Sequence, residues 1–116
     1  MMREQVYARA LLMAGDLDGH RQELLGVLCA ANAAALEARL RSGLTPEDCR
    51  EEFITAAGLS ALADMDGFEE VAEFKAGDLT VKTGQQDGEQ RAESLRHQAE
   101  SLMAPYLKDR FVFVGV

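Results

Sequence analysis

The residues of this chain that could carry chemistry are two histidines and two cysteines. His20 and His97 lie far apart in the sequence, and neither has the ligand-spaced companions that a zinc site needs. A cysteine nucleophile needs an activating histidine in an electropositive setting, whereas Cys49 stands between Asp48 and Arg50 in an acidic segment. We therefore expect no metal site and no enzymatic activity.

Three further patterns resemble ligand-binding loops without completing them. Asp16-Leu17-Asp18-Gly19 and Asp64-Met65-Asp66-Gly67 begin like calcium loops, but both lack the glycine at the sixth position and the glutamate at the twelfth. Gly84 and Gly88 lack the lysine and hydroxyl residue that complete a phosphate-binding loop. These patterns predict turns, and we expect no cofactor.

The length and composition favour one folded domain over residues 1–116. The chain is 47% hydrophobic and 28% charged, with two prolines and no low-complexity tract. Its apolar runs are too short to cross a membrane, and the N-terminal residues lack the pattern of a signal peptide. Cys29 and Cys49 could form a disulfide, but both stand on apolar faces of predicted helices. Two reduced core thiols are the preferred interpretation.

Apolar spacing predicts a first helix over about residues 2–14 and a second over about residues 18–41. The first helix ends at Gly15, and Ser42-Gly43 closes the second. In the second helix, apolar residues recur at steps of four, three and four, which predicts that they form its buried face: Leu24, Leu28, Ala31 and Ala35. Its alanine-rich centre would permit a close approach of another helix.

A third helix is predicted to begin at Thr45-Pro46, with threonine as its cap and proline in its first turn. Its apolar face continues to Asp66-Gly67, where the pattern breaks. A fourth helix is predicted from about Glu89. Its apolar stripe recurs at steps of three and four: Ala92, Leu95, Ala99, Leu102 and Tyr106.

Between these last two helices, residues 71–81 show two short alternating runs around Ala76-Gly77-Asp78. This pattern predicts a β-hairpin, followed by a polar loop over residues 83–88. The apolar residues 111–116 predict a short strand that pairs with another edge in an assembly. The predicted fold is mainly α, a bundle of about four helices with a hairpin or loop inserted at about 71–88 and a C-terminal strand. The expected interaction residues are Phe74, Lys75, Gly77, Asp78, Leu79, Val81, Phe111, Phe113 and Val114.

The negative charge of the chain is concentrated in residues 44–73. This segment holds nine acidic residues and one arginine, which accounts for the whole net charge of −8. Such a segment repels phosphate backbones and argues against groove-reading nucleic-acid binding. It is either a solvated helix face or a surface past which DNA slides without sticking. The acidic surface is predicted to include Glu47, Glu51, Glu69, Glu70 and Glu73.

The order of elements resembles a known family. Helices followed by FKAGDLTV, a polar loop, the helix AESLRHQAESLMAPYL and a closing FVFVGV are similar to phage and prophage head–tail connectors, the gp6-like adaptor family. The resemblance implies a subunit that assembles into a ring below the portal, passes DNA through its lumen without specific binding, and seats a neck or tail protein. It places the chain in the virion, or in the host cytoplasm during assembly. It also implies that residues 71–88 form the contact-making loop and that the C-terminal run reaches the portal or an adjacent copy.

A second hypothesis does not involve a virion. The chain could be a small bacterial helical adaptor or regulatory protein, cytoplasmic, that binds another protein through the same hairpin and acidic helix. The oligomeric state separates the two hypotheses, because a connector forms a high oligomer whereas an adaptor stays monomeric or dimeric.

Overall fold

The computed structural model describes the backbone of residues 2–76 and 81–108, and the side chains of residues 2–67 and 90–108. Over these residues the chain forms four α-helices: α1 (Met2–Ala14), α2 (Gly19–Ala38), α3 (Arg50–Ala76) and α4 (Val81–Met103). Short 3-10 turns precede α3 (η1, Pro46–Cys49) and follow α4 (η2, Ala104–Tyr106). The described part contains no strand, and its mainly helical fold confirms the coarse prediction.

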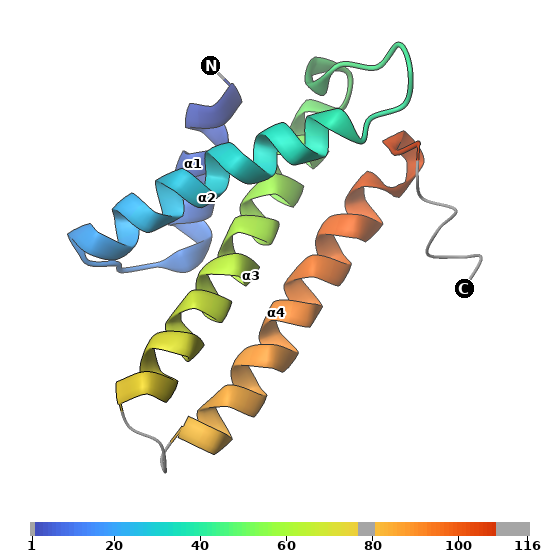
Figure 1. Ribbon diagram of the computed structural model, residues 1–116. Helices are drawn as coiled ribbons and strands as arrows, with labels where there is room; N and C mark the ends of the chain where they lie inside the picture. The colour runs from blue at the N-terminus through green and yellow to red at the C-terminus, as the bar shows by residue number, and fades with distance from the viewer. Residues whose placement is uncertain (1, 77–80, 109–116) are drawn as a thin grey trace.

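The two longest helices, α3 and α4, form an antiparallel hairpin (Figure 1). The shorter helices α1 and α2 lie across the N-terminal half of α3, so the far end of the hairpin extends beyond them (Figure 1). The result is a flat molecule with principal extents of 49 × 36 × 18 Å.

The predicted helix boundaries hold where capping residues mark them. Asp18 caps α2, because its Oδ1 accepts a hydrogen bond from the Arg21 backbone N at 2.8 Å. Gly15 follows α1 with φ of 83°, and Gly43 lies between α2 and η1 with φ of 89°; this left-handed region favours glycine. Thr45 caps the 3-10 turn η1 and Pro46 begins it, and this turn leads directly into α3 at Arg50, four residues after the predicted start.

The core surrounds α3. Its largest fully buried side chains come from every helix and from the turn after α4, and include Val6, Leu25, Phe53, Met103 and Leu107. Cys29 and Cys49 belong to the same core and are free thiols, as predicted. Gly58 lies where α1 packs against α3, because a Cβ at that position would lie 3.0 Å from Met13 Cε and 3.6 Å from Ala10 Cβ.

The predicted β-hairpin is wrong in the described residues. Residues 71–76 continue α3, and residues 81–88, including the predicted polar loop, form the first turns of α4. Val71 and Phe74 are strand formers, but they are three residues apart, which also suits a helix. Ala72, Glu73 and Lys75 favour helix. Gly77, Asp78 and Leu79 lie outside the described residues, as does the predicted strand over 111–116.

The buried face of α2 is also different from the predicted one. Leu25, Cys29 and Ala33 are buried, whereas Ala31 and Ala35 are exposed. Both sets of residues have helical spacing, so periodicity alone does not choose between them. Contacts with the neighbouring helices choose between them, and one of these contacts is the hydrogen bond that Asn32 donates to Asp64 Oδ2 of α3 at 2.9 Å.

A short backbone bridge joins the end of α2 to the end of α4. Leu40 and Leu107 form an isolated antiparallel β-bridge. The Arg41 N donates to the Tyr106 carbonyl at 2.9 Å, and the Lys108 N donates to the Arg39 carbonyl at 3.0 Å. The described chain therefore ends beside the C-terminus of α2.

Candidate functional site

The far end of the α3–α4 hairpin holds the three predicted interaction residues whose backbone the structure describes. Phe74 and Lys75 lie in the last turn of α3, and Val81 begins α4. Gly77, Asp78 and Leu79 between them are outside the described residues, as are Phe111, Phe113 and Val114 of the C-terminal run. The structure therefore brings the first group to one end of the molecule through the fold of two helices, without a β-hairpin.

Ion pairs across the helices support this hairpin. Arg91 of α4 donates to Asp66 of α3 at 2.8 Å, and Arg96 donates to Asp64 at 3.3 Å. Closer to the opposite end, Arg39 makes a two-pronged contact with Glu100 of α4 at 2.7 and 2.9 Å. Two parallel hydrogen bonds give such a pair a fixed orientation. These contacts were missed because sequence patterns within one helix give no signal of charge pairing between helices.

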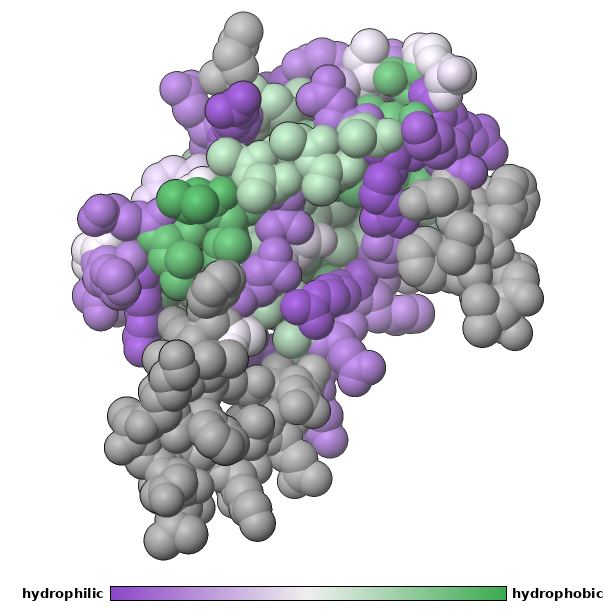
Figure 2. Space-filling model, viewed as in Figure 1, coloured by the Kyte–Doolittle hydropathy of each residue, from purple (hydrophilic) through white to green (hydrophobic). Residues whose placement is uncertain are grey.

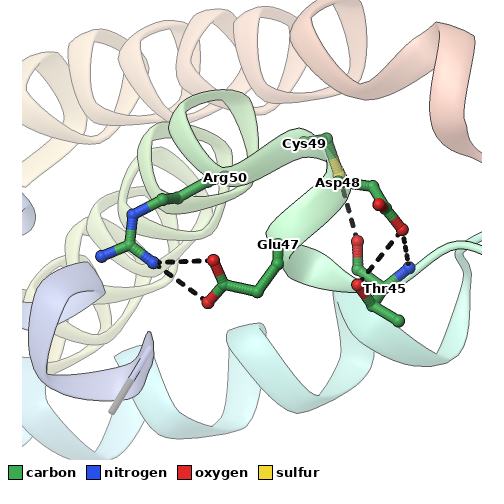
Figure 3. Close-up of polar contacts among 5 residues, drawn as sticks. All are labelled: Thr45, Glu47, Asp48, Cys49 and Arg50. Carbon is green, nitrogen blue, oxygen red and sulfur yellow. Dashed lines mark hydrogen bonds and ion pairs between the residues drawn. The ribbon is translucent and has the colours of Figure 1, made fainter.

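The acidic surface is partly neutralised in the folded chain. Glu47 accepts two hydrogen bonds from Arg50 at 3.0 Å (Figure 3), and Glu51 pairs with Arg9 of α1 at 3.1 Å. Asp48 accepts hydrogen bonds from the Thr45 backbone N at 2.7 Å and from its Oγ1 at 3.1 Å (Figure 3). Several of these carboxylates therefore anchor helices. The backbones of Glu69, Glu70 and Glu73 lie farther along α3, and their side chains are outside the described residues.

The cysteines and histidines do not assemble into a reactive centre within the part whose side chains are described. Burial raises the pKa of Cys29 from 9.0 to about 11. Burial, with the nearby Glu52 and Asp48 carboxylates, also raises the pKa of Cys49. Both effects disfavour the thiolate, which is the nucleophilic form. His20 and His97 are exposed on different helices, and no cluster of three metal-binding side chains occurs among the described residues.

An apolar groove lies between α1 and α4, with α3 as its floor. It has a volume of about 480 Å³ and is lined by Met13, Thr55, Leu59, His97, Ser101 and Leu102, together with Gln98. Met13 and Leu102 are more than one-third exposed on its walls, and Leu12 of α1 is 81% exposed. Sequence spacing missed this groove because its lining comes from three helices.

A second apolar surface covers the outer side of α2. Figure 2 shows it as a green band that follows α2 across the face of the molecule. We call it the α2 outer stripe and define it as Leu24, Val27, Leu28, Ala31, Ala35 and Ala38. Val27 is 66% exposed, Leu24 and Leu28 are half-buried, and the three alanines are exposed. The stripe contains the residues that spacing predicts to be buried. Leu24 and Leu28 at its edge also pack against the core, so the exposed part of the stripe is Val27 and the three alanines.

Comparisons of the chain with protein-family models, with curated proteins and with solved structures give no match. Within the described residues, none of the helices combines the length and apolarity needed to cross a membrane.

Proposed function

We propose that this chain is an assembly protein that acts through protein–protein contacts, as a subunit of a phage or prophage head–tail connector. The observation that carries the proposal is the α3–α4 hairpin, whose far end extends beyond the body formed with α1 and α2 (Figure 1). A projecting element on a rigid scaffold presents its surface to a partner. The resemblance in residues 71–116 supplies the particular partners: other copies in a ring, the portal, and a neck or tail protein.

The contacts at the base of the hairpin support a contact role. The pairs Arg91–Asp66 and Arg96–Asp64 hold α4 to α3 near the point where the hairpin leaves the body. Asn32 of α2 donates to the same Asp64 carboxylate, which ties the hairpin to α2. Contacts that hold the base of a projecting element reduce the conformational entropy that it loses on binding.

The proposal also assigns a role to the acidic segment. In a ring, acidic residues facing the lumen would let DNA pass without specific binding. Glu69, Glu70 and Glu73 follow one another along α3 near the hairpin end, and they are the proposed luminal positions.

The deciding experiment compares the full chain with a shortened hairpin. Deleting residues 70–76 and 81–87 removes seven residues, about two helical turns, from each of α3 and α4. Because whole turns are removed, the remaining parts of the two helices still face each other with the same sides. The full chain is expected to form a closed oligomer larger than a dimer as its concentration rises, measured by light scattering and native mass spectrometry. The shortened chain is expected to keep helical circular dichroism and to remain monomeric. A full chain that stays monomeric at every concentration, or a shortened chain that assembles like the parent, refutes the connector role.

The apolar groove favours one alternative function. A small bacterial adaptor or regulatory protein would use the cleft lined by Met13, Leu59 and Leu102 to receive an amphipathic helix of another protein. Such an adaptor is expected to be monomeric or dimeric. Replacement of Leu102, which is exposed on the groove wall, by lysine would then abolish partner binding, whereas shortening the hairpin would leave it intact.

A further inference from the structure

Exposed apolar side chains gather around the groove between α1 and α4. Among the residues whose side chains are described, four large hydrophobic residues are exposed: Leu12, Met13, Val27 and Leu102. Met13 and Leu102 stand on the walls of the groove, and Leu12 is the neighbour of Met13 on α1. Of the four, Val27 alone lies elsewhere, on α2. Exposed apolar side chains that cluster in this way mark an interaction surface, whereas single ones do not.

The groove is longer than the cavity described above. A second cavity, of about 400 Å³, shares Met13 with the first and continues along α3 to Met65. Charged side chains, including the Arg91–Asp66 pair, border this second cavity. From Thr55 to Met65 the floor spans about 15 Å at 1.5 Å per helical residue. A helix of about three turns fits this length, and α1 with its 13 residues is slightly longer.

The lining favours a helix as the occupant of the groove. The walls and floor are side chains of three helices, whose backbone groups are bonded within each helix, so an extended segment buried there would leave its amides and carbonyls unpaired. A helix satisfies these groups internally. The residues that line the larger cavity include no aspartate, glutamate, lysine or arginine. A helix with an uncharged face can therefore be buried there without desolvating a charge.

The outer face of α1 has this character. Gln5, Ala8 and Leu12 are exposed and follow one another at steps of three and four, so they form one uncharged stripe on α1. Leu12 is 81% exposed beside the groove wall. It points away from the groove of its own chain, because adjacent residues of a helix diverge by about 100° and Met13 forms the wall. Its side chain can therefore enter a groove on another molecule.

We propose that the groove receives α1 of a second copy, with Leu12 of each chain packed against Leu59 and Leu102 of the other. The projecting Leu12 and the groove lie side by side on one surface, so two copies related by a two-fold axis fill both grooves at once. The α1 helices of the two copies then lie beside each other. This one contact covers Leu12, Met13 and Leu102 in both chains.

The pair contact is separate from the projecting hairpin. Helix α1 lies across the N-terminal half of α3, away from the far end of the hairpin (Figure 1). Each chain contributes one helix face and one groove, so we expect a total buried area below about 1,200 Å², the range of weak, transient contacts. The contact alone leaves the chains monomeric in dilute solution, and it adds to other contacts where copies are held close together. The inference does not rest on the connector role.

Disulfide capture between two single variants tests the pair. Chains with Leu12→Cys are mixed with chains with Leu102→Cys, and the products of oxidation are identified by peptide mapping. We expect dimers joined through positions 12 and 102 to form at least about tenfold faster than dimers from a mixture of Leu12→Cys and Val27→Cys. Val27 is a matched exposed control on α2. The parent chain measures any reaction of the buried Cys29 and Cys49.

A second readout needs no added cysteine. In sedimentation equilibrium of the full chain at high concentration, Leu12→Asp should raise the Kd of self-association at least about tenfold, because it buries an unpaired charge in the contact. The matched variant Val27→Asp should leave this Kd unchanged.

Three results would overturn the proposal. The first is an equal cross-linking rate for the two mixtures. The second is a loss of self-association with Leu102→Asp but not with Leu12→Asp, which would show that another part of the second copy fills the groove. The third is no effect of either substitution, which would leave the groove to a helix of another protein. The hairpin deletion tests the connector role on a different surface, so the two proposals can fail separately.

Discussion

The crossing of α1 over Gly58 predicts opposite effects for two substitutions at one position. In a helix interior, Gly→Ala stabilises by about 1 kcal/mol through helix propensity alone. At Gly58 the new Cβ would lie 3.0 Å from Met13 Cε, the end of a flexible side chain that is 38% exposed. Met13 can move away at little cost. We therefore expect Gly58→Ala to retain about half of the gain, roughly 0.5 kcal/mol.

Valine at the same position should destabilise the fold. Its added methyl groups extend toward Ala10, whose Cβ and backbone N lie only 3.6 Å from the position of a Cβ on Gly58. The Ala10 backbone cannot rotate away as the Met13 side chain can. We therefore expect overpacking to lower the free energy of unfolding by about 1–3 kcal/mol. At about 4 °C per kcal/mol for a domain of this size, the alanine and valine variants should differ visibly in Tm.

Gly67 provides the matched control on the same helix. A Cβ there has nothing within 4 Å, so Gly67→Ala should give the full propensity gain and Gly67→Val should be nearly neutral. The free energy of unfolding is measured by urea denaturation followed by circular dichroism. If Gly58→Val costs no more than Gly67→Val, α1 does not cross α3 at this point, and the reasoning fails.

Three further predictions concern the core, the thiols and the acidic surface. Phe53→Ala should lower the free energy of unfolding by about 3–5 kcal/mol in urea, because the ring is 1% exposed; a loss below about 1 kcal/mol would contradict its place in the core. Burial raises the pKa of Cys29 from 9.0 to about 11, so the folded state holds this proton more tightly. The contribution of Cys29 to the free energy of unfolding is complete below pH 9 and is lost as the pH rises toward 11, about 2–3 kcal/mol in all. Thermal melts of the parent over this pH range should show the decline. The Cys29→Ala variant should show a smaller decline. Replacing Glu69, Glu70 and Glu73 by lysine should create salt-sensitive binding of duplex DNA, measured by fluorescence anisotropy. Tight DNA binding by the parent would refute the hypothesis that the acidic surface prevents DNA from binding.

Helix boundaries were predictable from sequence where a capping residue or a left-handed glycine marks them, because these signals are local. The end predicted for α3 at Asp66-Gly67 and the start predicted for α4 near Glu89 were wrong, since α3 continues to Ala76 and α4 begins at Val81. Asp18 supplies a cap whose hydrogen bond closes within three residues, and Thr45-Pro46 supplies another. Gly15 and Gly43 take left-handed conformations at positions expected to end helices. The reduced state of the two cysteines followed from their apolar neighbours.

The errors arose where tertiary contacts decide between equal local patterns. The apolar and aromatic residues of 71–81 suit strands when taken alone, but residues 71–76 belong to α3 and Val81 begins α4. On α2, two apolar stripes share one spacing, and the Asn32–Asp64 hydrogen bond is part of what selects the buried one. The groove between α1 and α4, and the Arg39–Glu100 pair across 61 residues, carry no sequence signal at all.

The bridge between Leu40 and Leu107 has a consequence for the order of folding. It closes a loop of about 65 residues that contains all of α3 and α4. Closing such a loop in a flexible chain costs about 4 kcal/mol of entropy, far more than two backbone hydrogen bonds return. The bridge should therefore form only after α3 and α4 have already brought its ends together. The hydrogen bonds of the Arg41 and Lys108 amides are therefore expected to form late in folding. In native-state hydrogen exchange, these two amides should exchange faster than those in the middle of α3.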